Sequence, residues 1–84
     1  MKKNKYKMLD GEKQQFIDKL NEVIDSYDIF SFSTLISHLN LGIFGSPIYN
    51  AKRDIIDEKL HQLVNNGKIE LIDGYKYRKI KDYE

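Results

Sequence analysis

The stretch that decides the fold runs from Ser46 to Tyr77 and reads SPIYNAKRDIIDEKLHQLVNNGKIELIDGYKY. Its first part predicts a long helix, because Ser46 is a good N-cap and Pro47 then falls at the first helical position, where its missing N–H costs nothing. Asn66-Gly67 predicts the end of this helix, since glycine tolerates the left-handed conformation at a helix C-terminus. Apolar residues recur at helical spacing inside it and form one stripe, namely Tyr49, Ile56, Leu60 and Leu63.

A β-hairpin is predicted directly after this helix, beginning with Lys68-Ile69-Glu70-Leu71. A two-residue loop, Asp73-Gly74, would pair Leu71 with Lys76 and mix apolar and charged residues on both faces. A three-residue loop, 72–74, with Gly74 in the left-handed bulge position, pairs Leu71 with Tyr75 and sets Glu70 opposite Lys76. Because burial of one face fixes the register, we prefer the three-residue loop. Its apolar face comprises Ile69, Leu71, Tyr75 and Tyr77.

Two further helices and a short strand are predicted upstream. Asp10 is a plausible N-cap of the first helix, whose apolar residues recur at helical spacing: Phe16, Leu20, Val23 and Tyr27. Ser31 can cap the second helix, because Phe30 before it and Leu35 after it form a hydrophobic staple. The apolar face of this second helix comprises Phe32, Leu35, Ile36 and Leu39. Residues 29–30 are expected to form a stub of strand.

Length and composition indicate one small globular domain. The chain has 84 residues, 40% of them hydrophobic and 32% charged, and we expect a flexible basic arm at 1–9, a domain at 10–80 and a short tail at 81–84. The absence of cysteine excludes disulfides and thiolate metal sites and fits a reducing compartment, so we expect a cytoplasmic protein. No apolar run approaches the length of a membrane span, so no membrane partner is expected.

The formal net charge of +1 hides an uneven distribution along the chain. Residues 1–7 contain four lysines and no acid, the first helix is acidic, and residues 29–50 carry no formal charge. Such zoning predicts distinct surfaces. The lysine-rich arm could contact phosphates, although a lysine-rich terminus is more often a solvated tail.

The order helix, short strand, helix, helix and hairpin resembles a winged helix-turn-helix domain over residues 10 to 80. The residues that carry the resemblance are Leu60-x-x-Leu63-x-x-x-Gly67-x-Ile69, followed by a glycine-containing hairpin and Tyr77. The predicted fold class is therefore α+β, mostly α: a winged helix with three helices, a strand stub and a C-terminal hairpin wing. One departure is the connection at 40–45, which is longer than the family's usual turn of about three or four residues.

The resemblance implies binding of double-stranded DNA, with the third helix in the major groove and its early turns contacting bases. Asn50 can pair bidentately with adenine, and Arg53 with guanine or phosphate. Ser46 and Tyr49 share these turns, although Tyr49 lies on the core stripe and is expected mainly to pack. The other candidate contacts to phosphate are three hydroxyls of the second helix, two basic wing residues and two arm lysines: Ser33, Thr34, Ser37, Lys76, Arg78, Lys3 and Lys5.

A protein-interaction or dimerisation module without DNA binding is the alternative. Asp54, Asp57 and Glu58 on the third helix oppose phosphate contact, and a net charge of +1 is below that of a dedicated DNA-binding protein. If Ile43 and Phe44 are exposed, they form an apolar knob of the kind that marks an interface. We nevertheless favour a small DNA-binding transcriptional regulator, of viral or mobile-element origin given its size, with a homodimer as one open assembly.

No constellation of catalytic residues is present, so an enzyme is not expected. His38 and His61 lack a partner at metal-ligand spacing, and we predict neither a metal site nor a cofactor. The pair Gly42 and Gly45 is not followed by the Lys-Ser or Lys-Thr of a phosphate-binding loop.

Overall fold

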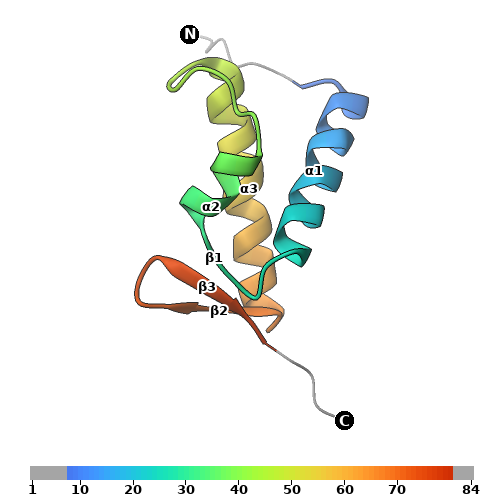
Figure 1. Ribbon diagram of the computed structural model, residues 1–84. Coiled ribbons are helices and arrows are strands. Elements are labelled where there is room, and N and C mark those ends of the chain that lie inside the picture. The colour runs from blue at the N-terminus through green and yellow to red at the C-terminus, as the bar shows by residue number, and fades with distance from the viewer. Residues whose placement is uncertain (1–7, 81–84) are drawn as a thin grey trace, which may run out of the picture.

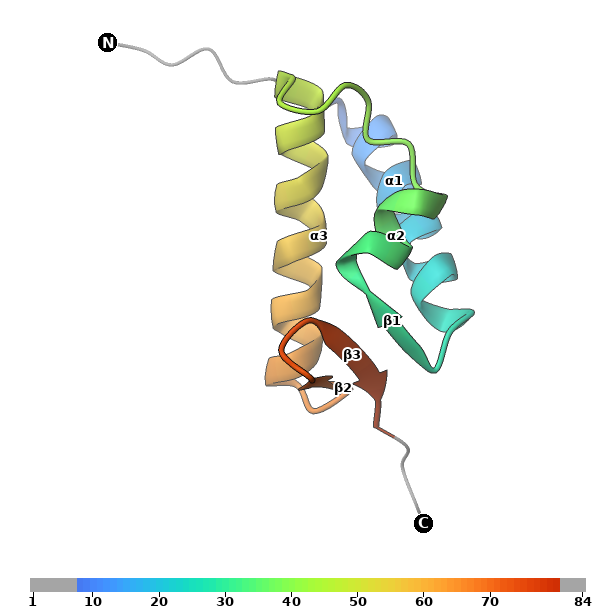
Figure 2. The ribbon, with the colours of Figure 1, turned by 60° about the vertical axis from the view of Figure 1, so that its left-hand side comes forward.

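The computed structural model describes residues 8–80, which form three helices and one small sheet. The elements are α1 (Asp10–Asp25), β1 (Ile29–Ser31), α2 (Phe32–His38), α3 (Pro47–Asn65), β2 (Ile69–Ile72) and β3 (Lys76–Lys79). Figure 1 labels these elements, and in Figure 2 α1 and α2 lie on the same side of the long α3, with the hairpin beside the C-terminal end of α3. This arrangement confirms the predicted α+β fold, with three helices, a short strand and a C-terminal hairpin in a winged-helix-like order.

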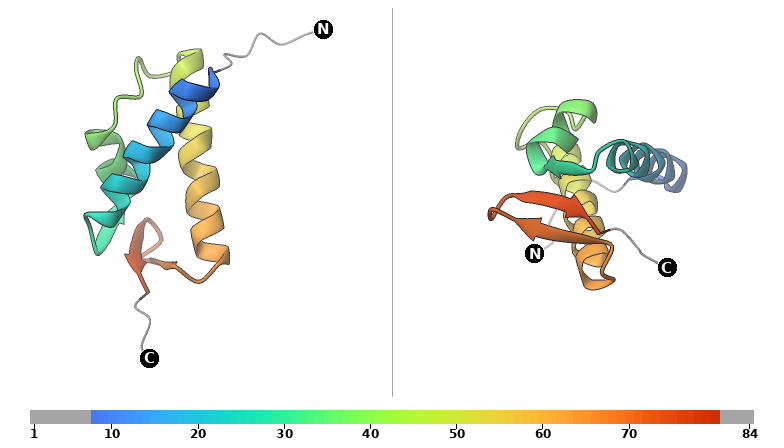
Figure 3. Two further views of the ribbon diagram at one scale, coloured as in Figure 1. Left: turned by 90° about the vertical axis from the view of Figure 1, so that its right-hand side faces the viewer. Right: turned by 60° about the horizontal axis from the view of Figure 1, so that its bottom comes forward.

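The sheet joins the hairpin to the helices. Its strand order is β1-β3-β2, with both pairs antiparallel, so that β3 is the central strand. The predicted strand stub is confirmed as β1, in which Phe30 lies opposite Tyr77. Figure 2 and Figure 3 show the sheet beside the C-terminal end of α3, where it closes one end of the helical layer.

One side chain from each helix, together with one from β1, forms the centre of the core. Leu20, Leu35 and Ile56 have no exposed surface, and Phe30 is 2% exposed. Burial of four large apolar side chains stabilises the fold by roughly 1.5–3 kcal/mol each. The amphipathic stripes of all three helices therefore meet where the sequence predicts.

Side chains cap the starts of α2 and α3 as predicted. The Ser46 hydroxyl accepts the backbone N–H of Tyr49 at 3.2 Å, and Ser31 and Thr34 accept each other's backbone N–H at 3.2 Å. The prediction for α1 is wrong by one residue, because Leu9 is its N-cap and Asp10 is its first helical residue. The Glu12 carboxylate accepts the Leu9 N–H at 3.4 Å, and α1 therefore begins one residue earlier than predicted.

The C-terminus of α3 ends in the reversal predicted at Gly67. This glycine has φ +74°, its N–H donates to the carbonyl of Val64, and the N–H of Lys68 donates to the carbonyl of Leu63. These two bonds form a Schellman motif, which satisfies carbonyls that the helix leaves unpaired. The chain thereby turns directly into β2.

The hairpin register differs from both predicted alternatives. Leu71 lies opposite Tyr77 and Ile72 opposite Lys76, so the loop is 73–75, with Asp73 at φ +53° and Gly74 at φ +78°. Tyr75, predicted on the buried face, is 62% exposed. The difference lies in the loop: two consecutive residues with positive φ, Asp73 and Gly74, turn the chain, and Tyr75 becomes a loop residue. Ile69, Leu71 and Tyr77 still share one face, as predicted, and the Tyr77 ring stacks on Phe30 of β1 with the centroids 5.7 Å apart.

The cross-strand ion pair changes with the register. Glu70 lies opposite Arg78, not opposite Lys76 as predicted, and accepts a hydrogen bond from its Nε at 2.9 Å. This pair lies on the face of the hairpin opposite to Tyr77, because successive side chains of a strand alternate between faces.

The predicted arm and tail lie mostly outside the described residues, so their boundaries stay predictions. Met8, at the end of the predicted arm, packs against the core. Between residues 8 and 80, no helix has the length and apolar character needed to cross a membrane.

Two glycines with opposite backbone requirements provide a test of this fold. A Cβ at Gly67 meets no atom within 4 Å, so Gly67→Ala should destabilise the protein only through its left-handed backbone, by about 1–2 kcal/mol. The control Gly11→Ala, in the first turn of α1 with equal space, should instead stabilise it by about 0.5 kcal/mol. Urea unfolding of both variants measures the difference. Equal effects would contradict the reversal at Gly67.

Candidate nucleic-acid interface

One exposed face of α3 runs its whole length, and we call it the α3 stripe. Its residues recur at spacings of three or four and are all exposed: Asn50, Arg53, Asp57, His61 and Val64. Ile56 and Leu60 are buried and hold the helix on the core. The two residues predicted to read bases, Asn50 and Arg53, therefore lie together on the outside, in the first turns of the helix.

Arg53 makes one contact with the start of α2 and one within α3. The carbon at the centre of its guanidinium lies 5.8 Å from the centroid of the Phe32 ring, and its Nε is 4.0 Å from the Asp57 carboxylate. Both charged side chains are more than half exposed, so this ion pair stabilises the protein by less than about 1 kcal/mol. Asp57 therefore competes only weakly with a phosphate or a base for Arg53.

The neighbours of Asn50 in the first turns of α3 have structural roles. Tyr49 is half-buried, packs against the core and meets the Phe44 ring edge-on, with the centroids 5.1 Å apart. Ser46 uses its hydroxyl as the helix cap. Ser46 and Tyr49 thus hold the first turn of α3 in place, and this fixes the position of Asn50 on its exposed side.

The hydroxyls of α2 are mainly used within the helix. Thr34 takes part in the cap with Ser31, and the Ser37 hydroxyl donates to the Thr34 carbonyl at 2.9 Å. Ser33 is exposed, and its hydroxyl makes no hydrogen bond to any residue in the part of the chain that the structure describes. Of the three predicted phosphate contacts on α2, Ser33 is the most available.

The two hairpin residues predicted to contact phosphate, Lys76 and Arg78, point away from α3. Lys76 and Arg78 share the face of β3 opposite to Tyr77, while Tyr77 faces α3. The Lys76 ammonium lies 5.5 Å from the centroid of the Tyr75 ring at the loop, and Arg78 is bonded to Glu70. The structure does not bring these two residues onto the α3 stripe. The arm lysines Lys3 and Lys5 lie outside the described residues, and their role stays a prediction.

Acidic side chains are concentrated in and just after α1. Residues 8–80 carry nine basic and eleven acidic side chains, and six of the acids fall between Asp10 and Asp28. The α3 stripe carries one acid, Asp57, beside Arg53. Asp54 and Glu58 are exposed elsewhere on α3.

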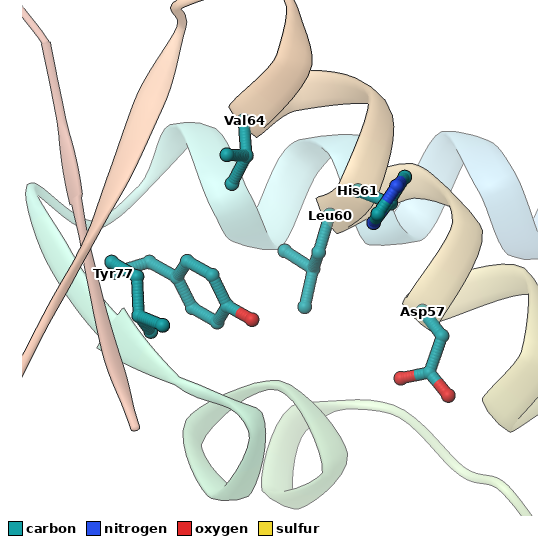
Figure 4. A pocket seen from close by; sticks show the side chains of 6 residues that line it. Asp57, Leu60, His61, Val64 and Tyr77 are labelled. Carbon is teal, nitrogen blue, oxygen red and sulfur yellow. The ribbon is translucent and has the colours of Figure 1, made fainter. Parts of the chain in front are cut away.

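A groove of about 380 Å³ lies between α3 and the hairpin, and the sequence did not predict it. Figure 4 shows the Leu60 and Tyr77 side chains pointing into it, with the Asp57 carboxylate at its rim. Its lining residues are Asp57, Leu60, His61, Val64, Leu71 and Tyr77. The groove follows from the observed register, which sets Leu71 opposite Tyr77. Its mainly apolar lining suits an apolar side chain better than a phosphate.

The connection between α2 and α3 presents two apolar side chains to solvent, and we call it the apolar loop (residues 40–45). Ile43 and Phe44 are each 80% exposed. The loop is held from beneath, because the Lys52 ammonium donates to the Asn40 carbonyl at 2.8 Å and the Ser46 N–H donates to the Ile43 carbonyl at 2.9 Å. This exposure meets the condition set above for an apolar knob.

Neither histidine lies in a metal-ligand cluster. His38 shares a hydrogen bond with the Tyr27 hydroxyl, and His61 lines the groove. Within residues 8–80 no group of three or more His, Cys, Asp or Glu side chains is arranged to hold a metal ion.

Comparison of the chain with protein-family models, curated proteins and solved structures found no match. The winged-helix family therefore stays a resemblance.

The cap of α3 can be tested directly. Ser46→Ala removes the acceptor for the Tyr49 N–H and should lower the free energy of unfolding by about 1 kcal/mol. The control Ser33→Ala, at an exposed position on α2, should change it by less than about 0.5 kcal/mol. Denaturant unfolding compares the two variants. Similar values for both would show that Ser46 does not hold the start of α3.

Proposed function

We propose that this protein binds double-stranded DNA through the first turns of α3 and acts as a small cytoplasmic regulator of transcription. The observation that supports this function is the exposure of Asn50 and Arg53 on one face of a capped helix, with Arg53 directed towards the start of α2 by Phe32.

The side chains suit the chemistry of base recognition. In the major groove an Asn amide can pair with N6 and N7 of adenine, and an Arg guanidinium with O6 and N7 of guanine. An α-helix about 10–12 Å across fits a major groove about 12 Å wide. Ser33, which is exposed on α2 beside this helix, can donate to a phosphate oxygen without breaking a bond of its own.

Few cations are placed to contact phosphate, which sets the expected strength of binding. On the described part of the chain Arg53 is the cation of the α3 stripe, and Lys76 at the hairpin loop faces away from α3, so it serves a phosphate beyond the stripe. The arm lysines Lys3 and Lys5 can add two more contacts. Each phosphate contact contributes about −0.9 to the slope of log affinity against log salt, so four contacts give a slope of roughly −3 to −4. Binding should thus be moderate and best seen at low salt.

The base-reading role predicts a loss of affinity on truncation. Asn50→Ala and Arg53→Ala should each weaken binding to the preferred duplex by roughly ten- to hundredfold, because each removes a bidentate contact of about 1–3 kcal/mol. The matched controls Asn21→Ala and Lys19→Ala, of similar side-chain type on α1, should leave it unchanged. Fluorescence anisotropy at low and moderate salt measures these affinities. Absence of binding at low salt, or equal effects at α1 and α3, would contradict the proposal.

Replacement of Lys76, at the hairpin loop, should affect DNA binding differently from replacement of Asn50 or Arg53. Lys76→Ala should weaken binding to all duplexes alike and reduce the salt slope by about 1, because it removes a phosphate contact and no base contact. Arg78→Ala should have a smaller effect, since Arg78 is already bonded to Glu70. Titrations of two unrelated duplexes over a range of salt concentrations separate these outcomes. A change in base preference on removal of Lys76 would assign it a different role.

A further inference from the structure

The apolar loop and the groove lie towards opposite ends of the α3 stripe. Phe44 contacts Tyr49 near the start of α3, whereas the groove is centred on Leu60 and His61, eleven or twelve residues further along. At 1.5 Å per residue this separation is about 16–18 Å along the helix axis. Figure 2 shows the connection from α2 crossing the start of α3, with the hairpin near its other end. One face of the molecule thus has an apolar projection and an apolar recess.

The projection and the recess have matching chemistry. Ile43 and Phe44 are each 80% exposed, while Val64 and Leu71 at the groove are 39% and 52% exposed. Residues 29–50 carry no formal charge, so insertion of the loop into a groove desolvates no charged side chain of that segment. The loop of one molecule therefore brings no charge into the groove of another, and Asp57 at the rim is the acidic side chain that the pair has to satisfy.

The charges on the α3 stripe select one orientation for such a pair. If two α3 helices lie antiparallel about a two-fold axis near residue 55, Arg53 of each copy lies opposite Asp57 of the other. The same alignment sets Tyr49 opposite His61, which brings each apolar loop to the groove of the second copy. A parallel alignment would instead set Arg53 against Arg53 and Asp57 against Asp57, and like charges across an interface are unfavourable.

The buried area favours a closed, reciprocal pair over a one-way contact. Two side chains that are 80% exposed can bury about 300 Å² per loop. With two loops and two grooves the interface buries about 1,200 Å², which reaches the range of specific interfaces, whereas a single insertion buries about half of that. A two-fold dimer also closes the assembly, since each groove is filled.

We propose that two copies of this chain form an antiparallel dimer through the α3 stripe, each inserting Ile43 and Phe44 into the groove of the other. The dimer covers Asn50 and Arg53, so a second copy and duplex DNA compete for one face of the molecule. Only the monomer then presents its base-reading residues, and protein concentration controls access to them. The dimer itself does not depend on DNA binding.

The first test removes the apolar contact from either side. Sedimentation velocity over a concentration series should show a dimer for the wild type, and Phe44→Ser and Leu71→Ser should each raise its dissociation constant at least tenfold. The matched control Leu9→Ser removes a side chain that is 74% exposed at the start of α1 and should leave the dimer intact. A wild type that stays monomeric at all concentrations, or a dimer equally stable in Phe44→Ser, overturns the proposal.

The second test swaps charges and reports the orientation. Arg53→Glu and Asp57→Arg alone each place like charges opposite one another and should weaken the dimer, whereas the double variant should restore it. The swap of Lys19 and Glu22, an ion pair on α1, is the control and should have no effect. Failure of the double variant to recover dimerisation, with the fold intact by circular dichroism, overturns the antiparallel arrangement.

The third test separates this inference from DNA binding. At protein concentrations where the wild type is dimeric, Phe44→Ser should bind a duplex more tightly than the wild type, because it stays monomeric. A dimer that forms without any affinity for DNA supports the present inference and contradicts only the proposed function. A duplex bound equally by wild type and Phe44→Ser under these conditions contradicts competition for one face.

Discussion

The contact between Phe30 and Tyr77 is the interaction on which the arrangement of the hairpin depends. Phe30 is 2% exposed and stacks on Tyr77 across the β1–β3 pair. Because strand side chains alternate, an inward Tyr77 directs Lys76 and Arg78 to the other face. Leu71 lies opposite Tyr77, and these two residues form the hairpin side of the groove. The Phe30–Tyr77 contact thus holds this face of the hairpin against the core.

Features that depend on neighbouring residues could be predicted from the sequence. The caps at Ser31 and Ser46 and the reversal at Gly67 need only side chains or backbone within a few positions, so their residue types identify them. The start of α1 was missed by one residue because Leu9 is the N-cap, and its N–H donates to the carboxylate of Glu12 at the third helical position.

Features that depend on distant residues could not be predicted. The pairing of β3 with β1 joins residues more than forty positions apart, and the hairpin sequence alone does not reveal it. The hairpin register was wrong because the loop is 73–75, although the inward residues Ile69, Leu71 and Tyr77 were predicted. The groove was missed because it needs the contact between the hairpin and α3. The placement of Arg53 against Phe32 joins two helices, and helical periodicity predicts its exposure but not its neighbour. The functional hypotheses themselves rest on side-chain types, while the structure supplies their grouping.

The pairing of β1 with β3 has a consequence for how the chain folds. Ile29 and Arg78 are partners although almost fifty residues separate them, whereas α3, its reversal and the hairpin involve contacts between near neighbours. Closing a loop of that length costs several times RT in chain entropy before any contact compensates for it. The local unit from α3 to β3 can assemble quickly, and the capture of β1 is then the slow, non-local event. Until β1 pairs with β3, Phe30 is exposed to water. Formation of the complete sheet is therefore the step that buries Phe30 and gives the native state.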